Sequence, residues 1–558
     1  MTTLAAIQTY LTEHQIDCYI VTRNNMFIGA DVLPNENKIR ELTGFTGSAG
    51  SLLVFADHAV LLVDGRYELQ ASLQVDTAQI KVVCTRDSLG SWIHHNLKQP
   101  TAFMYDAWCH STAETDYWHR ALEQHRFIED NDHLLGERIN HKESEIFELK
   151  EEFTGISSDE KIAEFAKFLQ ENKLDAYLLC ECDSVSWLMN LRSDLIQYSP
   201  YLRAYALVDS DGGVSLFTAD FSKLQTELSR YSGKLIGLNF ARTPRRILAC
   251  LKDNRIRFRN INNPIVDWKS IKNPIEIDGF RKCHLRDGVA VCEFWHWLVQ
   301  NYTSVDEINC VERLHELRAL QEHYYSESFA TIAGCDANSA IIHYQPQPDT
   351  NRKLNTDSLL LLDSGAHYFD GTTDITRTFV FATAKPEIKA AYTQVLKAHI
   401  ALSRQRFPAG TSGAQLDAVA RSRLWMYDKD YAHGTGHGVG HCLNVHEGPQ
   451  SISLKNPIAL KSGMICSIEP GYYQAGAFGI RIENLAVVRQ AFPERDDSPL
   501  YFDTLTLVPY ERKLIAPILL DKDEITWVND YHQKVYTALA PLLKPEVAAW
   551  LKEITLPL

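Results

Sequence analysis

The sequence lacks the segments that direct a protein out of the cell or into a membrane. Its first ten residues, Met1 to Tyr10, contain no basic stretch followed by an apolar run, so we expect no export signal. No stretch approaches the roughly 18 uninterrupted apolar residues that a membrane-spanning helix requires. We therefore expect a cytoplasmic protein without a membrane partner.

The sequence also lacks closely spaced cysteines and an excess of positive charge. The 12 cysteines are spread thinly from Cys18 to Cys466, without the dense spacing of a secreted disulfide scaffold, so we expect free thiols. Lysine and arginine number 56 against 71 aspartates and glutamates, which gives a net charge of -15. This balance argues against nucleic acid or an anionic membrane surface as a partner.

The chain is too long for one hydrophobic core. Its 558 residues predict two to four domains. Hydrophobic residues at 45% and charged residues at 23% lie in the range of globular proteins. The chain should therefore fold as a multidomain globular protein.

Two segments of the first half follow one plan of helix, strand, linker, strand, turn and strand. The first runs through residues 7–63 and the second through residues 161–217. This similarity predicts two tandem α/β domains of related fold, residues 1–145 and 146–268. The pairs Asp64-Gly65 and Asp211-Gly212 predict hairpin turns.

A third region, residues 269–558, contains the candidate catalytic and metal-binding residues. Pro274 is well placed to begin a helix, and a second helix is expected over residues 305–321. Beyond it, strands and loops contain an unusual density of His, Asp and Glu. We expect the functional site here.

Two aspartates follow or interrupt apolar strands in this region. Asp363 ends the run Ser358-Leu-Leu-Leu-Leu, and Asp374 lies on the next strand, which we expect to pair with the first. Alone, Asp363 has an ordinary interpretation as a turn residue and Asp374 as a solvated one. An acid that ends a four-leucine strand is nevertheless costly to bury unless it is paired or metal-bound.

Histidines cluster further along the chain. His433, His437 and His446 fall within fourteen residues, and glycines between them let the backbone approach other groups closely. This spacing does not fit a core histidine on a helix, so the cluster favours a functional role.

Two glutamates complete the candidate set. Glu469 and Glu483 lie within or at the end of apolar alternating strands, where a carboxylate needs a partner. With Asp363, Asp374 and His437 they offer four carboxylates and one imidazole, which suit Mn²⁺, with Zn²⁺, Co²⁺ or Fe²⁺ as alternatives. Two such ions about 3.5–4 Å apart can share a hydroxide that attacks an amide bond. The pattern predicts a two-metal peptidase.

These residues resemble the metal ligands of the pita-bread metallopeptidases, and their surroundings resemble the eukaryotic-type cytosolic branch of the aminopeptidase P family. The resemblance covers nearly the whole chain. It rests on Ile341-Ile-His-Tyr, Asp363-Ser-Gly-Ala, Asp370-Gly-Thr-Thr-Asp-Ile-Thr-Arg-Thr, His433-Gly-Thr-Gly-His-Gly-Val-Gly, Asn444-Val-His-Glu-Gly-Pro, Glu469-Pro-Gly-Tyr-Tyr and Gly479-Ile-Arg-Ile-Glu-Asn, with Gly44-Phe-Thr-Gly-Ser-Ala-Gly and Trp187-Leu-Met-Asn-Leu-Arg in the leading segments. It implies an α/β (α+β) architecture of two creatinase-like domains followed by a pita-bread catalytic domain.

The resemblance also implies a role for each ligand. Asp363 would hold one metal, and His437 with Glu469 would hold the other. Asp374 and Glu483 would bridge both metals. Glu469 would in addition handle the proton of the bridging water.

Five further residues would support the reaction. His343, His433 and His446 match histidines that orient the scissile amide, stabilise its developing charge and shape the proline site. Phe329 matches a residue that packs on the substrate proline, and a plain core role remains open for it. Arg481 would steady the bridging carboxylates through a charge-assisted hydrogen bond.

The implied activity is removal of one amino-terminal residue from peptides with proline in second position. A prolidase, which cuts Xaa-Pro dipeptides, would use the same metal set. A catalytically inactive pita-bread module that binds peptides is the third possibility, but such modules lose ligands, and here all five are present. A methionine aminopeptidase would lack the two leading domains, and a creatinase would lack the metal ligands.

Two other segments bear on partners. The tail, about residues 505–558, resembles the helical extension of the family, with helices expected at residues 531–543 and 545–551, and it implies a homodimer. Where the family has a Ser-Glu-Tyr-like stretch, this chain reads Ile28-Gly-Ala-Asp-Val-Leu-Pro-Asn-Glu-Asn-Lys-Ile-Arg. That departure leaves open whether the first domain touches substrate across a dimer.

Overall fold

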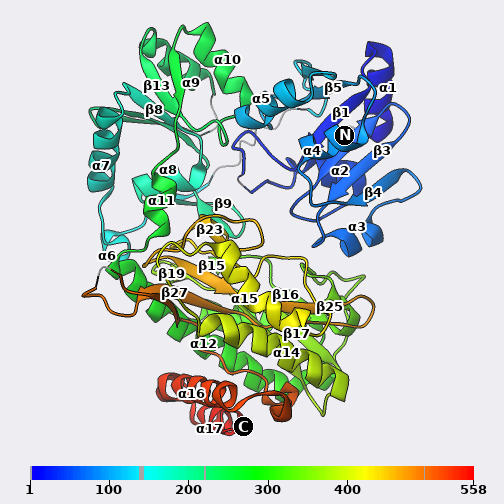
Figure 1. The fold of residues 1–558 in the computed structure, drawn as a ribbon, viewed down its shortest axis with the longest axis vertical. Helices are drawn as coiled ribbons and strands as arrows, with labels where there is room; N and C mark the ends of the chain where they lie inside the picture. The colour runs from blue at the N-terminus through cyan, green and yellow to red at the C-terminus, as the bar shows by residue number, and fades with distance from the viewer. Residues whose placement is uncertain (1–2, 30, 137–143, 219–220, 496) are drawn as a thin grey trace. The chain divides into compact units, whose positions relative to one another are not determined.

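The computed structural model describes residues 3–29, 31–136, 144–218, 221–495 and 497–558 (Figure 1). The chain forms two compact units. The first comprises Met1–Leu149 and Ile156–Ile265, and the second comprises Lys150–Gly155 and Val266–Leu558. Residues 137–143, just before the first predicted domain boundary, lie outside the described residues.

The first unit contains two sheets with the same core pairing. In one, β1 (Cys18–Thr22) pairs antiparallel with β2 (Ser51–Phe55) and parallel with β5 (Ala102–Tyr105). In the other, β8 (Ala176–Leu179) pairs antiparallel with β11 (Tyr205–Asp209) and parallel with β13 (Leu235–Leu238). This correspondence confirms the prediction of two related α/β folds in tandem.

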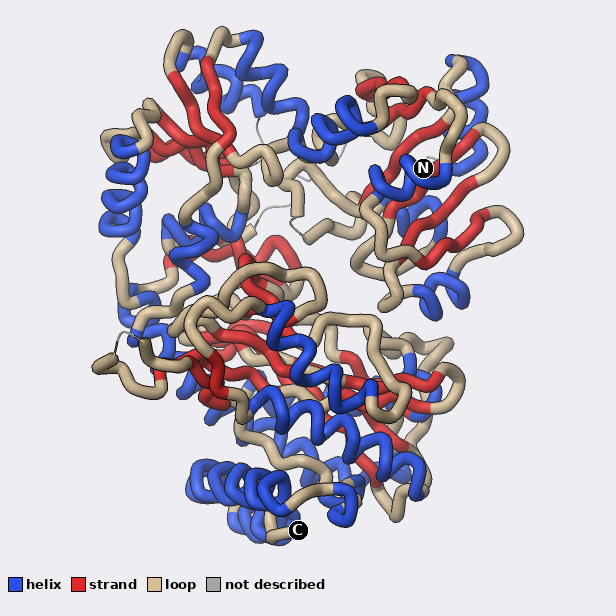
Figure 2. The backbone as a smooth tube through the Cα atoms, in the orientation of Figure 1, coloured by secondary structure: helices blue, strands red, loops and turns tan. Residues whose placement is uncertain are grey.

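The remaining elements complete these sheets and cover them (Figure 2). The sheet orders are β4-β3-β2-β1-β5-β6 and β12-β11-β8-β13-β14, with a small third sheet β10-β9-β7. The additional strands are β3 (Ala59–Val63), β4 (Ile80–Cys84), β6 (Arg126–Glu129), β7 (Ile146–Glu148), β9 (Leu191–Ile196), β10 (Ser199–Tyr201), β12 (Val214–Phe217) and β14 (Arg257–Asn260). The helices are α1 (Leu4–His14), α2 (Lys38–Thr43), α3 (Glu68–Gln74), α4 (Leu89–Asn96), α5 (Thr112–Ala121), α7 (Ser158–Glu171), α8 (Cys182–Met189), α9 (Phe221–Leu228) and α10 (Arg245–Asp253).

Only one of the two Asp-Gly hairpin predictions is confirmed. Asp211 and Gly212 join the antiparallel strands β11 and β12, and Gly212 has a φ of +92° that favours glycine. Asp64 instead follows β3, whose neighbour β4 runs parallel, so a hairpin there was wrong. The Asp64 carboxylate accepts hydrogen bonds from the backbone and side chain of Arg66.

The segment that departs from the family pattern packs within the first unit. Ser199 Oγ donates to Asp31 Oδ2 at 2.5 Å, and the backbone N–H of Asp31 donates to the Tyr201 hydroxyl at 2.6 Å. Arg203 forms a buried ion pair with Glu36 at 2.6 Å. The segment therefore fastens the first α/β fold to the second.

Two helices of the second unit begin and end close to their predicted positions. Pro274 occupies the first turn of α12 (Pro274–Asn301), and Asn273 caps it with a reciprocal capping box. Asp306 caps α13 (Glu307–Ala319) in the same way. None of the helices in the described ranges combines the length and apolar character needed to cross a bilayer.

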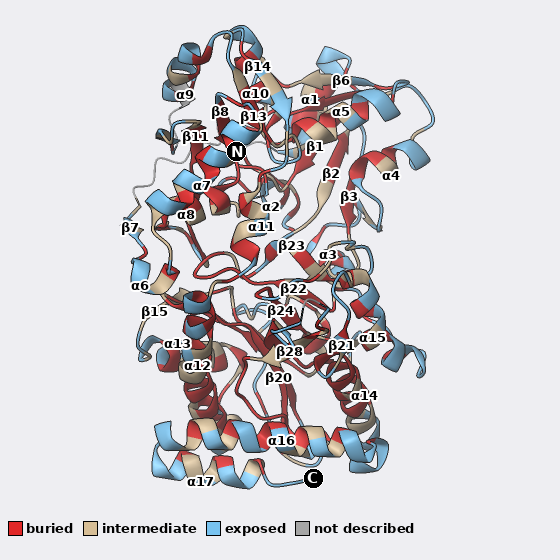
Figure 3. Cartoon of the chain, turned by 60° about the vertical axis from the view of Figure 1, so that its left-hand side comes forward, coloured by how far each residue is buried: buried red, intermediate tan, exposed pale blue. Residues whose placement is uncertain are grey.

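In the second unit the strands lie between long helices, with α12 on one side and α14 (Pro386–Ser403) on the other, and the inner faces of these helices are buried (Figure 3). β16 (Ile332–Cys335), β17 (Leu359–Ser364) and β20 (Ile375–Val380) form one antiparallel sheet, and the largest has the order β21-β28-β27-β24-β22-β23. Its strands are β21 (Arg406–Phe407), β22 (Gly436–Gly438), β23 (Glu447–Ile452), β24 (Ile465–Ile468), β27 (Asn484–Gln490) and β28 (Leu500–Thr504). The smaller sheets contain β15 (Tyr324–Glu327), β18 (Ala366–Tyr368) and β19 (Gly371–Thr372), and β25 (Gly471–Gln474) with β26 (Phe478–Arg481).

Apolar packing joins the C-terminal helices to this core. Val395 and Leu396 of α14 (Pro386–Ser403) lie in one buried cluster with Val528 and Val535 of α16 (Lys522–Leu539). α17 (Pro545–Ile554) follows, and α15 (Gly413–Trp425) packs on α14. The tail is thus an integral part of the second unit.

Candidate metal centre

The five predicted ligands lie in or beside strands of the second unit: Asp363 in β17, Asp374 just before β20, His437 in β22, Glu469 just after β24 and Glu483 between β26 and β27. β17 and β20 pair as expected, and their register sets Asp363 opposite Thr376. Strand pairing therefore draws together acids that are far apart in the sequence.

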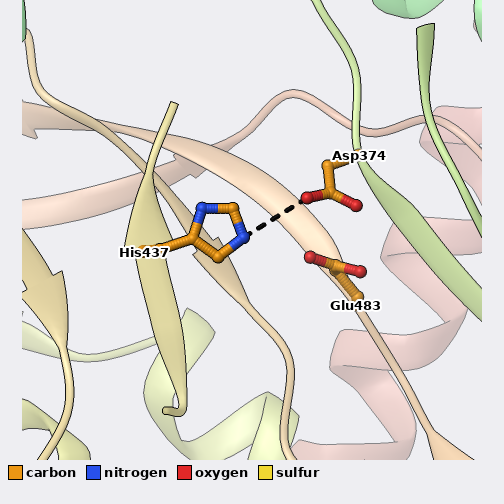
Figure 4. Close-up of side chains that lie close together, drawn as sticks. All are labelled: Asp374, His437 and Glu483. Carbon is orange, nitrogen blue, oxygen red and sulfur yellow. Dashed lines mark ion pairs between the residues drawn. The ribbon is translucent and has the colours of Figure 1, made fainter. Parts of the chain in front are cut away.

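Three of the ligands form a compact group (Figure 4). Asp374, His437 and Glu483 each offer one ligand atom, and these atoms lie within 4.8 Å of one another. His437 Nε2 is 3.3 Å from Asp374 Oδ2, while its Nδ1 lies 2.9 Å from the Gly438 carbonyl. Since Nδ1 donates to that carbonyl, the Nε2 lone pair is left for a cation.

Glu469 and Asp363 adjoin this group. Glu469 Oε1 lies 3.4 Å from His437 Nε2 and accepts a hydrogen bond from Ser467 Oγ at 3.0 Å. Asp363 Oδ2 accepts from Arg481 Nη2 at 2.5 Å. Across the described residues, Asp363 Oδ1 is buried without a hydrogen-bond partner. An orphaned carboxylate oxygen beside further acids and an imidazole fits a divalent cation.

The carboxylates raise one another's pKa. Burial, followed by the charges of Asp363 and Glu469, raises the pKa of Asp374 well above its ordinary value. Burial, followed by the charges of Asp374 and Glu469, does the same for Glu483. Burial also raises the pKa of Glu469, although His437 opposes it. A divalent cation would replace the protons that this cluster otherwise retains.

This electrostatic arrangement predicts how the metal-free protein responds to pH. Groups with a folded-state pKa above the unfolded value stabilise fully below the unfolded pKa, about 4 for carboxylates, and lose that contribution as pH rises. Because Asp374, Glu469 and Glu483 are all raised, metal-free stability should fall from about pH 4 upward. Saturating Mn²⁺ should flatten this profile, since it keeps the carboxylates ionised. Melting curves in EDTA and in Mn²⁺ at several pH values test this. If Mn²⁺ raised the melting temperature by the same amount at every pH, the prediction would be contradicted.

Glycines allow the strands of the centre to approach closely. A Cβ on Gly436 would lie 1.9 Å from the Ser467 carbonyl oxygen, and one on Gly438 would lie 2.3 Å from the Glu447 carbonyl oxygen. The prediction that glycines around His437 permit close backbone contact is therefore confirmed. The same approach lets the His437 N–H donate to Ser467 Oγ at 2.9 Å.

Arg481 connects the ligands to His433 through Tyr473. Arg481 Nη1 donates to the Tyr473 hydroxyl at 2.6 Å, and that hydroxyl lies 2.8 Å from His433 Nε2. His433 Nδ1 is 2.8 Å from the Gly434 carbonyl. Burial, followed by the charge of Arg481, lowers the pKa of His433 well below its ordinary value. His433 is therefore neutral, donating from Nδ1 and accepting the tyrosine proton at Nε2.

Sequence reasoning missed the hydroxyl groups that support the ligands. Thr376 Oγ1 donates to Glu483 Oε2 at 2.7 Å, and Ser467 binds Glu469 as described above. A signal existed, because alternate residues of a strand share a face. Thr376 lies two positions after Asp374, and Ser467 lies two positions before Glu469.

Two further predicted histidines lie beside the centre. The rings of His446 and His437 have centroids 4.2 Å apart. His343 is close enough to His433 for its charge to lower the His433 pKa. The residue before it, Ile342, accepts from Arg481 Nη2 at 3.4 Å through its carbonyl.

Phe329 and His441 are less directly placed. Phe329 is half-buried, one residue after Ser328, whose hydroxyl donates to the Thr373 carbonyl beside the centre. Its contact with a substrate proline stays a prediction. His441 belongs to the same glycine-rich stretch as the three candidate histidines, but its Nδ1 faces Glu276 at 3.9 Å.

Four protein-family descriptions match the chain. Metallopeptidase family M24 matches residues 278–490, and the C-terminal region of peptidase M24 matches residues 499–558. Two creatinase/prolidase N-terminal domain families match residues 4–130 and 137–236. These matches assign the two leading folds to creatinase-like domains and the remainder to a metallopeptidase domain.

Full-length relatives carry one kind of name. "Probable Xaa-Pro aminopeptidase P" of Coprinopsis cinerea is 34% identical over 608 residues, covering 100% of this chain and 98% of that protein. "Xaa-Pro aminopeptidase 1" of Dictyostelium discoideum is 34% identical over 609 residues, covering 99% of this chain and 96% of that protein.

Solved structures give the same result. X-prolyl aminopeptidase from Caenorhabditis elegans, described as a cytosolic enzyme with a di-nuclear active site, superposes with a TM-score of 0.90 at 30% identity over 97% of this chain and 95% of that one. A prolidase from Thermococcus sibiricus, with a TM-score of 0.51 at 21% identity over 64% of this chain and 98% of that one, shares the fold alone. The chain therefore belongs to metallopeptidase family M24, among its full-length Xaa-Pro aminopeptidase P relatives.

Proposed function

We propose that the chain is a two-metal Xaa-Pro aminopeptidase that releases the first residue of peptides with proline in second position. The observation that carries the proposal is the buried group of Asp374, His437 and Glu483, with ligand atoms within 4.8 Å of one another. It occurs in a chain whose full-length relatives are named Xaa-Pro aminopeptidases.

We assign the ligands as the family resemblance implies. Asp363 would hold one metal, His437 and Glu469 would hold the other, and Asp374 and Glu483 would be shared by both. When bound, two divalent ions lower the pKa of a shared water and polarise the scissile carbonyl. Mn²⁺ is the proposed metal, because the donor set is rich in oxygen and contains no thiolate.

Glu469 is the proposed acid and base. Its carboxylate borders the ligand group and is only partly buried, so it can meet both a water and a peptide. Its Oε2 lies 3.7 Å from His433 Nδ1, on the side away from Ser467. In this arrangement Glu469 takes a proton from the attacking water and returns it to the departing proline nitrogen.

The supporting residues hold the substrate. His343, His433 and His446 surround the ligands and are proposed to orient the scissile amide, while Phe329 packs against the substrate proline. His433 is held neutral and fixed in one tautomer, so it can act as a hydrogen-bonding group without adding a charge. Arg481 holds Asp363 in place by donating a hydrogen bond to its Oδ2, which leaves Oδ1 for a metal.

Cleavage of two peptides tests the function. The purified protein, stripped of metal and then given Mn²⁺, should release arginine from Arg-Pro-Pro and leave Gly-Pro largely intact. Activity on Gly-Pro alone would identify a prolidase instead. Failure to cleave either peptide, with metal bound, would favour a peptide-binding module.

We further propose that the protein is a cytoplasmic homodimer. Ile518 and Leu519, neighbours in the C-terminal extension, expose 92% and 39% of their surface. Such a patch is typical of an interaction surface, and a second copy is the partner that the family resemblance implies. The relative in Caenorhabditis elegans is described as cytosolic.

Replacing Ile518 with glutamate is expected to yield monomers, because a charge would be buried in the interface. Sedimentation velocity would show the change in mass. Leu320→Glu provides the matched control, since Leu320 is an isolated apolar side chain that is 79% exposed. A wild-type protein that sediments as a monomer would refute the proposed dimer.

A further inference from the structure

Arg377 is a buried cation that the proposed mechanism does not use. It lies in β20, three residues after Asp374, and is 1% exposed. Within the described parts of the chain its guanidinium has no carboxylate partner, and its hydrogen bonds go to neutral oxygens. These are Pro509 O at 2.9 Å, Thr376 O at 2.9 Å, Glu483 O at 2.6 Å, Asn484 Oδ1 at 2.8 Å, Val508 O at 2.6 Å and the Tyr531 hydroxyl at 3.2 Å.

These bonds join a proposed metal ligand to the C-terminal extension. On one side, Arg377 Nη1 binds the carbonyl of Glu483, whose N–H donates to the Thr376 carbonyl at 3.2 Å. On the other side, Nε and Nη2 bind Pro509 and Tyr531. The main chain of Glu483 is therefore hydrogen-bonded at both its N–H and its C=O. The bond to the C=O comes from Arg377, whose position depends on the extension.

A neutral histidine makes a parallel connection. His399 Nδ1 lies 3.0 Å from the carbonyl of Ile468, the residue before Glu469, and its Nε2 lies 3.1 Å from the Tyr510 hydroxyl. Burial, followed by the charge of Arg377, lowers the pKa of His399 to about 3. Nδ1 therefore donates to Ile468, and Nε2 accepts from the extension. Two ligand-bearing strands are thus braced by the same C-terminal segment.

The hydrogen-bond acceptors of Arg377 indicate that this side chain does more than fill space in the core. A buried guanidinium without a carboxylate destabilises a folded protein unless its donors are well satisfied. Here every acceptor is a neutral oxygen, and most of them are main-chain carbonyls. The hydrogen bonds therefore fix the backbone of Glu483 relative to that of the extension.

We propose that Arg377 is a positioning residue for the metal centre, which links the C-terminal extension to the bridging carboxylate Glu483. The inference rests on the proposed ligand role of Glu483. Loss of this link would let Glu483 move relative to Asp374 and His437, so that cations bind less tightly. Substrate contacts made elsewhere would remain.

Manganese binding to Arg377→Lys is the main test, because lysine keeps the charge but loses the forked geometry. Equilibrium dialysis of the metal-free full-length protein against Mn²⁺ should show binding roughly 10–100-fold weaker than in the wild type. In saturating Mn²⁺, kcat for Arg-Pro-Pro should fall while KM stays within about twofold. A rise in KM with unchanged kcat, or an unchanged affinity for Mn²⁺, would overturn the proposal.

A milder pair of variants covers the case in which Arg377→Lys does not fold. Tyr531→Phe removes one acceptor of Arg377, together with the bonds of its hydroxyl to the Val508 and Thr506 carbonyls at 2.9 Å and 3.0 Å, and keeps the packed ring. Tyr392→Phe is the matched control, because the Tyr392 hydroxyl accepts from the Glu511 N–H at 3.1 Å instead. Weaker Mn²⁺ binding in Tyr531→Phe but not in Tyr392→Phe supports the proposal, and equal affinities in both variants refute it. The dialysis needs no substrate, so a protein that binds Mn²⁺ but cleaves no Xaa-Pro peptide fails the proposed function only.

Discussion

Glutamine in place of Glu469 is expected to lower kcat for an Xaa-Pro peptide by roughly 10²–10⁴-fold, the range contributed by a positioned acid-base group. The amide has nearly the same shape and can still accept the Ser467 hydrogen bond at 3.0 Å. It cannot take up a proton, and it removes one negative charge beside His437. Steady-state kinetics on Arg-Pro-Pro in saturating Mn²⁺ would measure the loss.

Glu276→Gln is the control for this experiment. Glu276 is also buried, but its carboxylate closes the capping box of α12, a position in which glutamine serves equally well. Its kcat should stay within about twofold of the wild type. A Glu469→Gln protein that keeps a comparable rate would exclude Glu469 as the proton-transfer group.

Methionine in place of Arg481 is expected to damage both stability and catalysis. Arg481 is 2% exposed and donates to Asp363 at 2.5 Å, to Tyr473 at 2.6 Å and to Thr376 at 3.1 Å. Removing it leaves a buried Asp363 charge without its partner, which costs about 3–5 kcal/mol in the metal-free protein. The same change frees Tyr473 and, through it, His433, so we expect kcat roughly 10–100-fold lower.

Urea unfolding of the metal-free protein and peptide kinetics in Mn²⁺ would measure these two effects. Arg495→Met removes an arginine paired with Asp497 at 3.0 Å, where both side chains are at least half exposed. Such a surface pair contributes little, so this control should unfold and react like the wild type. Equal unfolding midpoints for the two variants would mean that Arg481 does not contribute to the stability of the metal-free protein.

Several of the proposed ligands could be found from the sequence because a buried carboxylate conflicts with its local setting. Asp363 ends a run of four leucines, and Glu469 follows the apolar strand β24. A strand pattern alone gives no reason for a carboxylate in such a place, so burial had to be compensated by a partner. His437 was identified from its cluster with two further histidines, because the glycines beside it do not fit a core histidine on a helix.

The supporting residues could not be found in this way, because they agree with their local setting. Thr376 and Tyr473 are favoured in strands, and His399 fits the buried face of a helix. Their importance lies in partners that are distant in the sequence, such as Arg481 and Ile468. Strand alternation could place Thr376 on the same face as Asp374, but its bond to Arg481 and the contact of His399 appear only in the register of the strands and the packing of α14.

The two Asp-Gly pairs show that a turn sequence alone does not determine which strands it connects. Asp64-Gly65 and Asp211-Gly212 carry the same dipeptide, yet only the second joins antiparallel neighbours. The outcome depends on which strand comes to lie beside β3, and that choice is made by the whole sheet. The periodic helices α12 and α13 were predictable because their caps and apolar faces are local.

The bonds of Arg377 have a consequence for how the protein matures. A ribosome delivers Asp363 early, Glu483 much later, and Pro509 and Tyr531 last of all. The guanidinium can grip Glu483 in its final place only after α16 has docked behind it. A nascent chain therefore carries an unfinished cation site until translation is complete.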